Sequence, residues 1–178
     1  SRTMTPSDDF VQTDETKIPK PEVLVLMATY NGATHLENQV NSILRQNGVD
    51  VSLLISDDAS SDGTDKLAMA LADRAHNIRV VRQVSPSGSA GNNFRQLLEI
   101  ADAGHYDFVA FADQDDEWLP NKLQRACDML RTSQCDAYSS SVIAQWPNGT
   151  SILLHQNPNV RPLDYFFEGA GQGCTFVI

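Results

Sequence analysis

The stretch that decides the fold is residues 108–116, FVAFADQDD, in which an apolar run ends in three carboxylates. An apolar run this short is typical of a buried strand. The acids would then emerge at the carboxyl end of that strand, where open α/β sheets bind their ligands. Carboxylate oxygens suit Mg²⁺ or Mn²⁺, which usually takes one or two carboxylates and completes its shell with substrate phosphates. The alternative is an acidic turn that caps the following helix, predicted over residues 121–131.

The rest of the chain alternates predicted strands with predicted helices. Apolar runs at 23–28, 51–55 and 78–81 predict three more strands, and apolar residues recur at helical spacing between them. This alternation predicts an α/β fold, with a Rossmann-like, mostly parallel sheet that helices cover on both faces. The loops that follow the strands should gather along one edge of the sheet. Residues 1–21 are polar and rich in acids and proline, so we expect a flexible leader followed by one domain over residues 22–178.

Composition narrows the class of protein. The chain has 178 residues and a formal net charge of −10, which argues against nucleic acid or an anionic membrane surface as the main partner. No stretch reaches the roughly 20 apolar residues of a membrane span. Cys127, Cys135 and Cys174 have neither zinc-site spacing nor a disulfide pattern, which favours a reduced compartment. Residues 147–149, Pro-Asn-Gly, predict a hairpin turn between residues 137–146 and 151–155.

Two acids follow the second predicted strand. Asp57 and Asp58 are adjacent and repel each other, and one of them must point into the sheet edge. A ligand donor, such as a base N–H or a hydroxyl, is one explanation, and solvation is the other. The next residues are good helix caps, and we expect that role for Ser61, Asp62 or Thr64.

Other loops give weaker signals. Tyr30 offers an aromatic face to a base and Asn31-Gly32 allows a tight turn, although residues 29–32 could also be a plain turn. Residues 88–93, with Arg95, could approach phosphates, but a simple loop and helix cap is the favoured interpretation. The sequence contains no P-loop, no GxGxxG after the first strand and no GxSxG.

Three ordered motifs, at residues 28–32, 55–64 and 111–118, together resemble the family 2 glycosyltransferases of the GT-A fold. The resemblance spans roughly residues 22–178. It implies that the first two loops hold the nucleotide base and ribose, and that Asp113-Gln114-Asp115 is a DxD motif whose metal, Mn²⁺ or Mg²⁺, bridges the donor diphosphate. Asp116 could substitute for either aspartate of that motif. The implied nucleotide-sugar contacts are Thr29, Tyr30, Asn31, Asp57, Asp58, Asp113 and Gln114, and the implied metal ligands are Asp115 and Asp113.

The resemblance also implies an activity. An inverting enzyme would move a sugar from a dTDP-, UDP- or GDP-linked donor to a glycan or lipid-linked acceptor in surface polysaccharide synthesis. The DQDD-E-W form is similar to rhamnosyltransferase-like members, which use a dTDP-linked deoxysugar. We expect such a protein in the cytoplasm, or at the inner membrane surface through regions outside this chain. A nucleotide- or metal-binding module without transfer activity is the alternative.

One part of the family pattern does not match. The family's catalytic base follows a Gly-rich segment that residues 169–174 resemble, but the chain stops at Ile178. Glu168 and Asp164 lie in no matching motif, so no catalytic base is assigned. We therefore expect a fold truncated at the C-terminus, the donor-binding part of a longer enzyme. Its exposed last strand would be a candidate for self-association.

Overall fold

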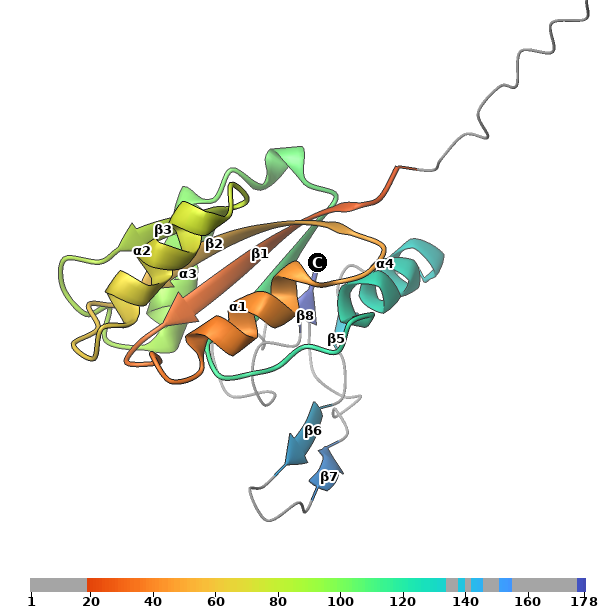
Figure 1. The fold of residues 1–178 in the computed structure, drawn as a ribbon. Coiled ribbons are helices and arrows are strands. Elements are labelled where there is room, and N and C mark those ends of the chain that lie inside the picture. Colours follow the sequence, from red (N-terminus) through yellow and green to blue (C-terminus); the bar gives the residue numbers. More distant parts are fainter. Residues whose placement is uncertain (1–18, 134–137, 140–141, 146–150, 155–175) are drawn as a thin grey trace, which may run out of the picture.

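The computed structural model describes residues 19–133, 138–139, 142–145, 151–154 and 176–178. One sheet has the strand order β3-β2-β1-β4-β8-β5, and β1 to β4 are parallel (Figure 1). The predicted α/β class with a mostly parallel sheet is confirmed. Most of the predicted leader lies outside the described residues. The elements are β1 Glu22–Thr29, α1 Leu36–Leu44, β2 Asp50–Asp57, α2 Thr64–Arg74, β3 Ile78–Arg82, α3 Ala90–Ile100, the 3-10 turn Ala103–His105, β4 Phe108–Asp113, α4 Lys122–Thr132, β5 Tyr138–Ser139, β6 Val142–Gln145, β7 Ser151–Leu154 and β8 Phe176–Val177.

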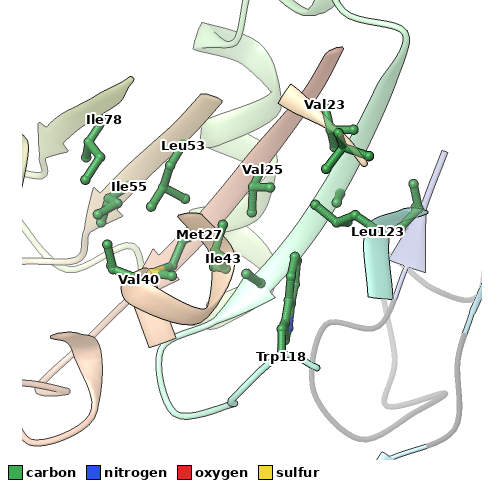
Figure 2. Close-up of a cluster of buried hydrophobic side chains, with 14 of the residues drawn as sticks. Val23, Val25, Met27, Val40, Ile43, Leu53, Ile55, Ile78, Trp118 and Leu123 are labelled. Carbon is green, nitrogen blue, oxygen red and sulfur yellow. The ribbon is translucent and has the colours of Figure 1, made fainter. Parts of the chain in front are cut away.

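Helices cover both faces of the sheet, as predicted. Side chains of a strand point alternately to its two faces. Val23, Val25 and Met27 of β1 therefore pack in one cluster with apolar residues of α1, α2 and α4 (Figure 2). Leu24 and Leu26 pack in a second cluster with residues of α3. β1 is buried on both sides, which explains why its sequence is apolar without alternation.

The order of the strands creates a switch point beside β1. The chain runs from β1 to β2 and β3 on one side, and then crosses to place β4 on the other side. The loops that leave β1 and β4 therefore lie side by side at this point, and ligands of open α/β sheets bind at such a point. The strand ends are level, because Thr29 pairs with Asp57 and Ala28 pairs with Asp113.

The expectation of an exposed last strand is wrong. β8 lies between β4 and β5, antiparallel to both, and Val177 is buried. The main chain of Ile178 also exchanges two hydrogen bonds with Val109, at 2.7 and 2.8 Å. Both sides of this short strand are therefore paired within the chain, so it offers no free edge to a second copy.

The predicted hairpin is confirmed in its strands. β6 and β7 pair antiparallel, with Val142 opposite Leu154 and Gln145 opposite Ser151. The predicted turn at residues 147–149 lies outside the described residues. Cys127 is a free, buried thiol of α4, and burial raises its pKa to about 11. Cys135 and Cys174 are not among the described residues.

Candidate functional site

Three polar loops meet at the carboxyl edge of the sheet. They follow β1 at residues 30–35, β2 at residues 58–63 and β4 at residues 114–121. The level strand ends bring these loops together, and hydrogen bonds between side chain and main chain connect them. All residues expected to bind nucleotide or metal lie on these loops or on the last residue of a strand.

Asp57 is bonded within the chain. Its side chain is buried and accepts hydrogen bonds from the Thr29 hydroxyl at 3.2 Å, the Ser60 main-chain N–H at 3.1 Å and the Ser60 hydroxyl at 2.6 Å. The sequence suggested that such an acid needs a donor from a ligand. The donors are instead Thr29 and Ser60, so Asp57 joins the end of β1 to the loop after β2. A direct contact of Asp57 or Thr29 with nucleotide stays a prediction.

Asn31 strengthens the same connection. It lies in the left-handed region, with φ of 49°, which asparagine tolerates better than most residues. Its main-chain N–H donates to the Ser60 hydroxyl at 2.9 Å, and its side-chain Oδ1 accepts from the Ser61 N–H at 2.9 Å. The first two loops are therefore held together as one polar unit.

Asp62 extends this unit, and the expected cap is partly wrong. The residue at the N-cap of α2 is Gly63, with φ of 94° and no side chain to cap the helix. Asp62 precedes it and accepts from the main-chain N–H groups of Thr64 at 3.0 Å and Ala33 at 3.1 Å. The hydrogen bond from the Thr64 hydroxyl lowers the pKa of the Asp62 carboxyl. Asp62 therefore connects the start of α2 to the loop before α1.

Asp58 connects the site to a fourth loop. It is 7% exposed and accepts from the Ser87 main-chain N–H at 2.5 Å and the Ser87 hydroxyl at 2.9 Å. Ser89 caps α3 by accepting from the Asn92 N–H at 3.2 Å, which confirms the loop-and-cap interpretation of residues 88–93. Arg95 forms an exposed ion pair with Glu99 at 2.6 Å.

Gln114 connects the loops on the two sides of the switch point. Its Oε1 accepts from the Tyr30 N–H at 2.7 Å, and its Nε2 donates to the Tyr30 carbonyl at 2.9 Å. Gly32 packs against this amide, because a Cβ there would lie 2.2 Å from Oε1 of Gln114. Tyr30 as a whole is 54% exposed, so its aromatic side chain is open to contact with a planar base.

The three acids after β4 differ in their surroundings. Asp115 is exposed, whereas Asp113 and Asp116 are half-buried. Burial raises the pKa of Asp116 to about 6, with repulsion from Asp113 and Asp115 acting in the same direction and Lys122 in the opposite one. A cation at this loop would relieve that repulsion.

The loop does not form a closed metal cage by itself. In the described part of the chain, no three acidic, histidine or cysteine side chains are placed to hold an ion together. Such an open site suits a Mg²⁺ or Mn²⁺ ion that takes one or two carboxylates and leaves positions for phosphate and water. The carboxylates of this loop are hard oxygen donors, the type of ligand that such an ion prefers.

Sequence reasoning missed the polar side chains of α1. Gln39 is completely buried and donates from Nε2 to the Asp113 carbonyl at 3.0 Å. Ser42 accepts at its hydroxyl from the Trp118 N–H at 3.0 Å. The available signal was a glutamine on the apolar face of the helix, beside Leu36, Val40 and Ile43, where a polar side chain needs a partner.

Comparisons with known proteins identify the family of this chain. The family model described as Glycosyl transferase family 2 matches residues 24–175. The chain belongs to this family. It is 41% identical to the dTDP-rhamnosyl transferase RfbG of Shigella flexneri over 153 residues, which are 85% of this chain and 53% of that protein. The family predicted from the three motifs is thus confirmed.

Two further relatives define the context. A UDP-Glc:alpha-D-GlcNAc-diphosphoundecaprenol beta-1,3-glucosyltransferase of Escherichia coli is 31% identical over 88% of this chain and 59% of its own length. The mannosyltransferase PcManGT of Pyrobaculum calidifontis, solved with GDP-Man and Mn²⁺, superposes with a TM-score of 0.61 at 24% identity. That superposition covers 73% of this chain and 37% of the mannosyltransferase, and it confirms the GT-A fold. The chain spans about half the length of the curated relatives it matches.

Proposed function

We propose that the protein is a metal-dependent, inverting glycosyltransferase, and that this chain is its donor-binding part. The observation that carries the proposal is the acidic loop, residues 113–118, lying beside the Tyr30 loop at the switch point of a family 2 sheet. A nucleotide-diphosphate sugar fits such a site. Its base would stack on the exposed ring of Tyr30, and its diphosphate would reach the carboxylates through a cation.

The donor we favour is a dTDP-linked deoxysugar. The support is the 41% identity to a dTDP-rhamnosyl transferase, which exceeds the 31% identity to a UDP-glucose enzyme. UDP- and GDP-linked sugars are the alternative donors. The acceptor we propose is a glycan or a lipid-linked sugar in surface polysaccharide synthesis, because the E. coli relative is named for a diphosphoundecaprenol substrate.

The site residues divide into contacts and supports. We propose that Tyr30, Asp58 and Asp113 contact the base and ribose, and that Asp115 with Asp113 ligates Mn²⁺ or Mg²⁺. The internal hydrogen bonds of Thr29, Asn31, Asp57, Asp58 and Gln114 favour a supporting role beside any nucleotide contact.

In the mechanism that we propose, the acceptor hydroxyl attacks the anomeric carbon on the face opposite the leaving diphosphate. A carboxylate takes the hydroxyl proton as the C–O bond to the diphosphate breaks, and the configuration at the anomeric carbon is inverted. Asp115 and Asp113 would hold a divalent ion, which would supply positive charge to the departing diphosphate. The described loops bind and orient the donor. We place the general base in the part of the relatives' length that this chain does not span.

The site of action we propose is the cytoplasmic side of the inner membrane, where a lipid-linked acceptor would be met. Among the described helices, none combines the length and apolar character needed to cross a bilayer.

Calorimetry with dTDP, UDP and GDP in excess Mn²⁺ tests the proposal. We expect the protein to bind dTDP most tightly, and Asp115→Asn to weaken that binding at least about tenfold through loss of a hard ligand. Asp128→Asn removes the same charge from an exposed position of α4 and serves as the control. An Asp115→Asn protein that binds all three nucleotides like the parent would contradict the metal assignment.

A further inference from the structure

We infer that Gln39 and Ser42 of α1 are positioning residues that fix both ends of the acidic loop, residues 113–118, and so set its affinity for a divalent cation and a nucleoside diphosphate. The inference rests on the proposed function for the ligand, and on the hydrogen bonds of α1 for the positioning. Neither residue was expected to take part from the sequence motifs.

Gln39 holds the beginning of the loop. Its side chain has no exposed surface, and its Nε2 donates to the main-chain carbonyl of Asp113 at 3.0 Å. Its Oε1 accepts from the Ser42 hydroxyl at 2.9 Å. The single proton of the Ser42 hydroxyl is shared between this Oε1 and the Gln39 main-chain carbonyl, which lies 2.8 Å away. Together with the bond from Nε2 to Asp113, this contact orients the buried amide.

Ser42 holds the end of the loop. Its hydroxyl oxygen accepts from the Trp118 main-chain N–H at 3.0 Å, while its own proton lies within reach of the Gln39 Oε1 and the Gln39 carbonyl. The ring of Trp118 is buried in the same core cluster as α1 (Figure 2). The hydroxyl and amide thus form a short relay from the Asp113 carbonyl to the Trp118 N–H.

The residues between these two fixed points include the candidate ligand Asp115. The acids of the loop repel one another, and an unsupported loop would open to separate them. Fixing the main chain at Asp113 and Trp118 keeps the carboxylates near one another before a cation binds. Ligand-orienting partners of this kind typically change metal affinity by about 10–100-fold when they are removed.

Packing alone does not explain a glutamine at position 39. A buried amide on the apolar face of a helix is costly unless its hydrogen bonds are made, and methionine would fill a similar volume without that cost. The amide donates to the Asp113 carbonyl, and its oxygen contacts the hydroxyl of Ser42, which accepts from the Trp118 N–H. The two partners outside α1, Asp113 and Trp118, are therefore the first and last residues of the acidic loop.

The segment just after α1 provides a matched control. Gln46 is 7% exposed, and its Nε2 donates to the Leu119 carbonyl at 2.8 Å while its Oε1 accepts from the Leu123 N–H at 2.9 Å. It therefore makes the same kind of side-chain bonds to the main chain. Its Nε2 also lies 3.2 Å from the main-chain carbonyl of Ser42. Its other two partners, Leu119 and Leu123, lie after Trp118 and so outside the acidic loop.

The experiment compares Gln39→Met, Ser42→Ala and Gln46→Met in the whole chain. Two quantities are measured: the Mn²⁺ concentration that half-saturates dTDP binding, and the amide hydrogen exchange of residues 113–118 without metal. We expect Gln39→Met and Ser42→Ala to raise the Mn²⁺ midpoint about tenfold or more and to speed exchange at Trp118. Gln46→Met should change neither the Mn²⁺ midpoint nor the exchange at Trp118, even if it lowers the melting temperature as much as Gln39→Met does. Ser42→Thr, which keeps the hydroxyl, should restore both values.

The two readouts separate failure of the inference from failure of the proposed function. Wild-type protein that needs no Mn²⁺ for dTDP would contradict the proposed function, and exchange would still decide whether Gln39 and Ser42 hold the loop. Unchanged exchange in both variants would overturn the inference. The inference would also be overturned if Gln39→Met and Gln46→Met shifted the Mn²⁺ midpoint and the amide exchange by the same amount for each degree of melting temperature lost. Ser42→Ala decides the matter if Gln39→Met does not fold.

Discussion

Replacing Asp116 with asparagine is expected to stabilise the metal-free protein at neutral pH. Burial, with repulsion from Asp113 and Asp115, raises the pKa of Asp116 from 3.8 to about 6. The native state then holds this proton more tightly than the unfolded chain does, so the free energy of unfolding falls as the pH rises from about 4 to about 6. A shift of about two pKa units corresponds to about 3 kcal/mol. Because Asp116 is partly exposed, solvent and salt reduce the expected effect to about 1 kcal/mol.

The assay is urea unfolding in EDTA of the wild type and of Asp116→Asn, at about pH 4 and at about pH 7.5. These values lie at the lower end and above the upper end of the pH range in which Asp116 titrates. We expect the variant to gain about 1 kcal/mol relative to the wild type between the lower and the higher pH. The exposed Asp128→Asn provides the control for net charge. A stability difference between Asp116→Asn and the wild type that is the same at both pH values would refute the reasoning about burial and repulsion.

Three more predictions follow from the site. Gly32→Ala should weaken nucleotide binding, because a Cβ would displace the Gln114 amide from Tyr30. Calorimetry measures the affinity and a thermal melt checks that the variant is folded; unchanged affinity would contradict the prediction. Asp57→Ala should cost about 3 kcal/mol in urea unfolding, since it removes the carboxylate that accepts from the buried Thr29 hydroxyl and from the half-buried Ser60; a loss below about 1 kcal/mol would show that water replaces the carboxylate. With the general base placed, as proposed above, in the part of the relatives' length that this chain does not span, residues 1–178 should bind donor but transfer sugar about 10²–10⁴-fold more slowly than a C-terminally extended version; a radiolabelled-donor assay of both proteins with a lysate-derived acceptor pool tests this, and robust transfer by the shorter protein would contradict it.

The central sheet could be predicted because its strands are buried on both faces. Apolar runs such as residues 23–28 and 108–112 have no alternation to misinterpret, and the polar loops that follow them mark one edge. The helices were equally clear from their apolar spacing. The position of β8 could not be predicted, because a strand of two residues has no period, and its pairing with β4 is decided by contacts distant in sequence.

The locations of the site residues were easier to predict than their bonds. The sequence placed Asp57 and Gln114 at the correct edge, yet spacing does not reveal that Thr29 and Ser60 satisfy one and that Tyr30 satisfies the other. Those partners depend on side-chain geometry after folding. Gln39 was detectable in principle, since a buried glutamine on an apolar helix face requires a hydrogen-bond partner.

The most direct test of the central claim is calorimetric titration of the wild-type protein with dTDP, in excess Mn²⁺ and in EDTA at matched ionic strength. In the proposed complex, a chain of net charge −10 presents Asp113, Asp115 and Asp116 to a diphosphate, so we expect a cation to be needed to offset the repulsion. We predict binding in Mn²⁺ and a loss of at least about tenfold in affinity in EDTA. Equal affinity in the two solutions would contradict a metal-dependent donor site at the acidic loop.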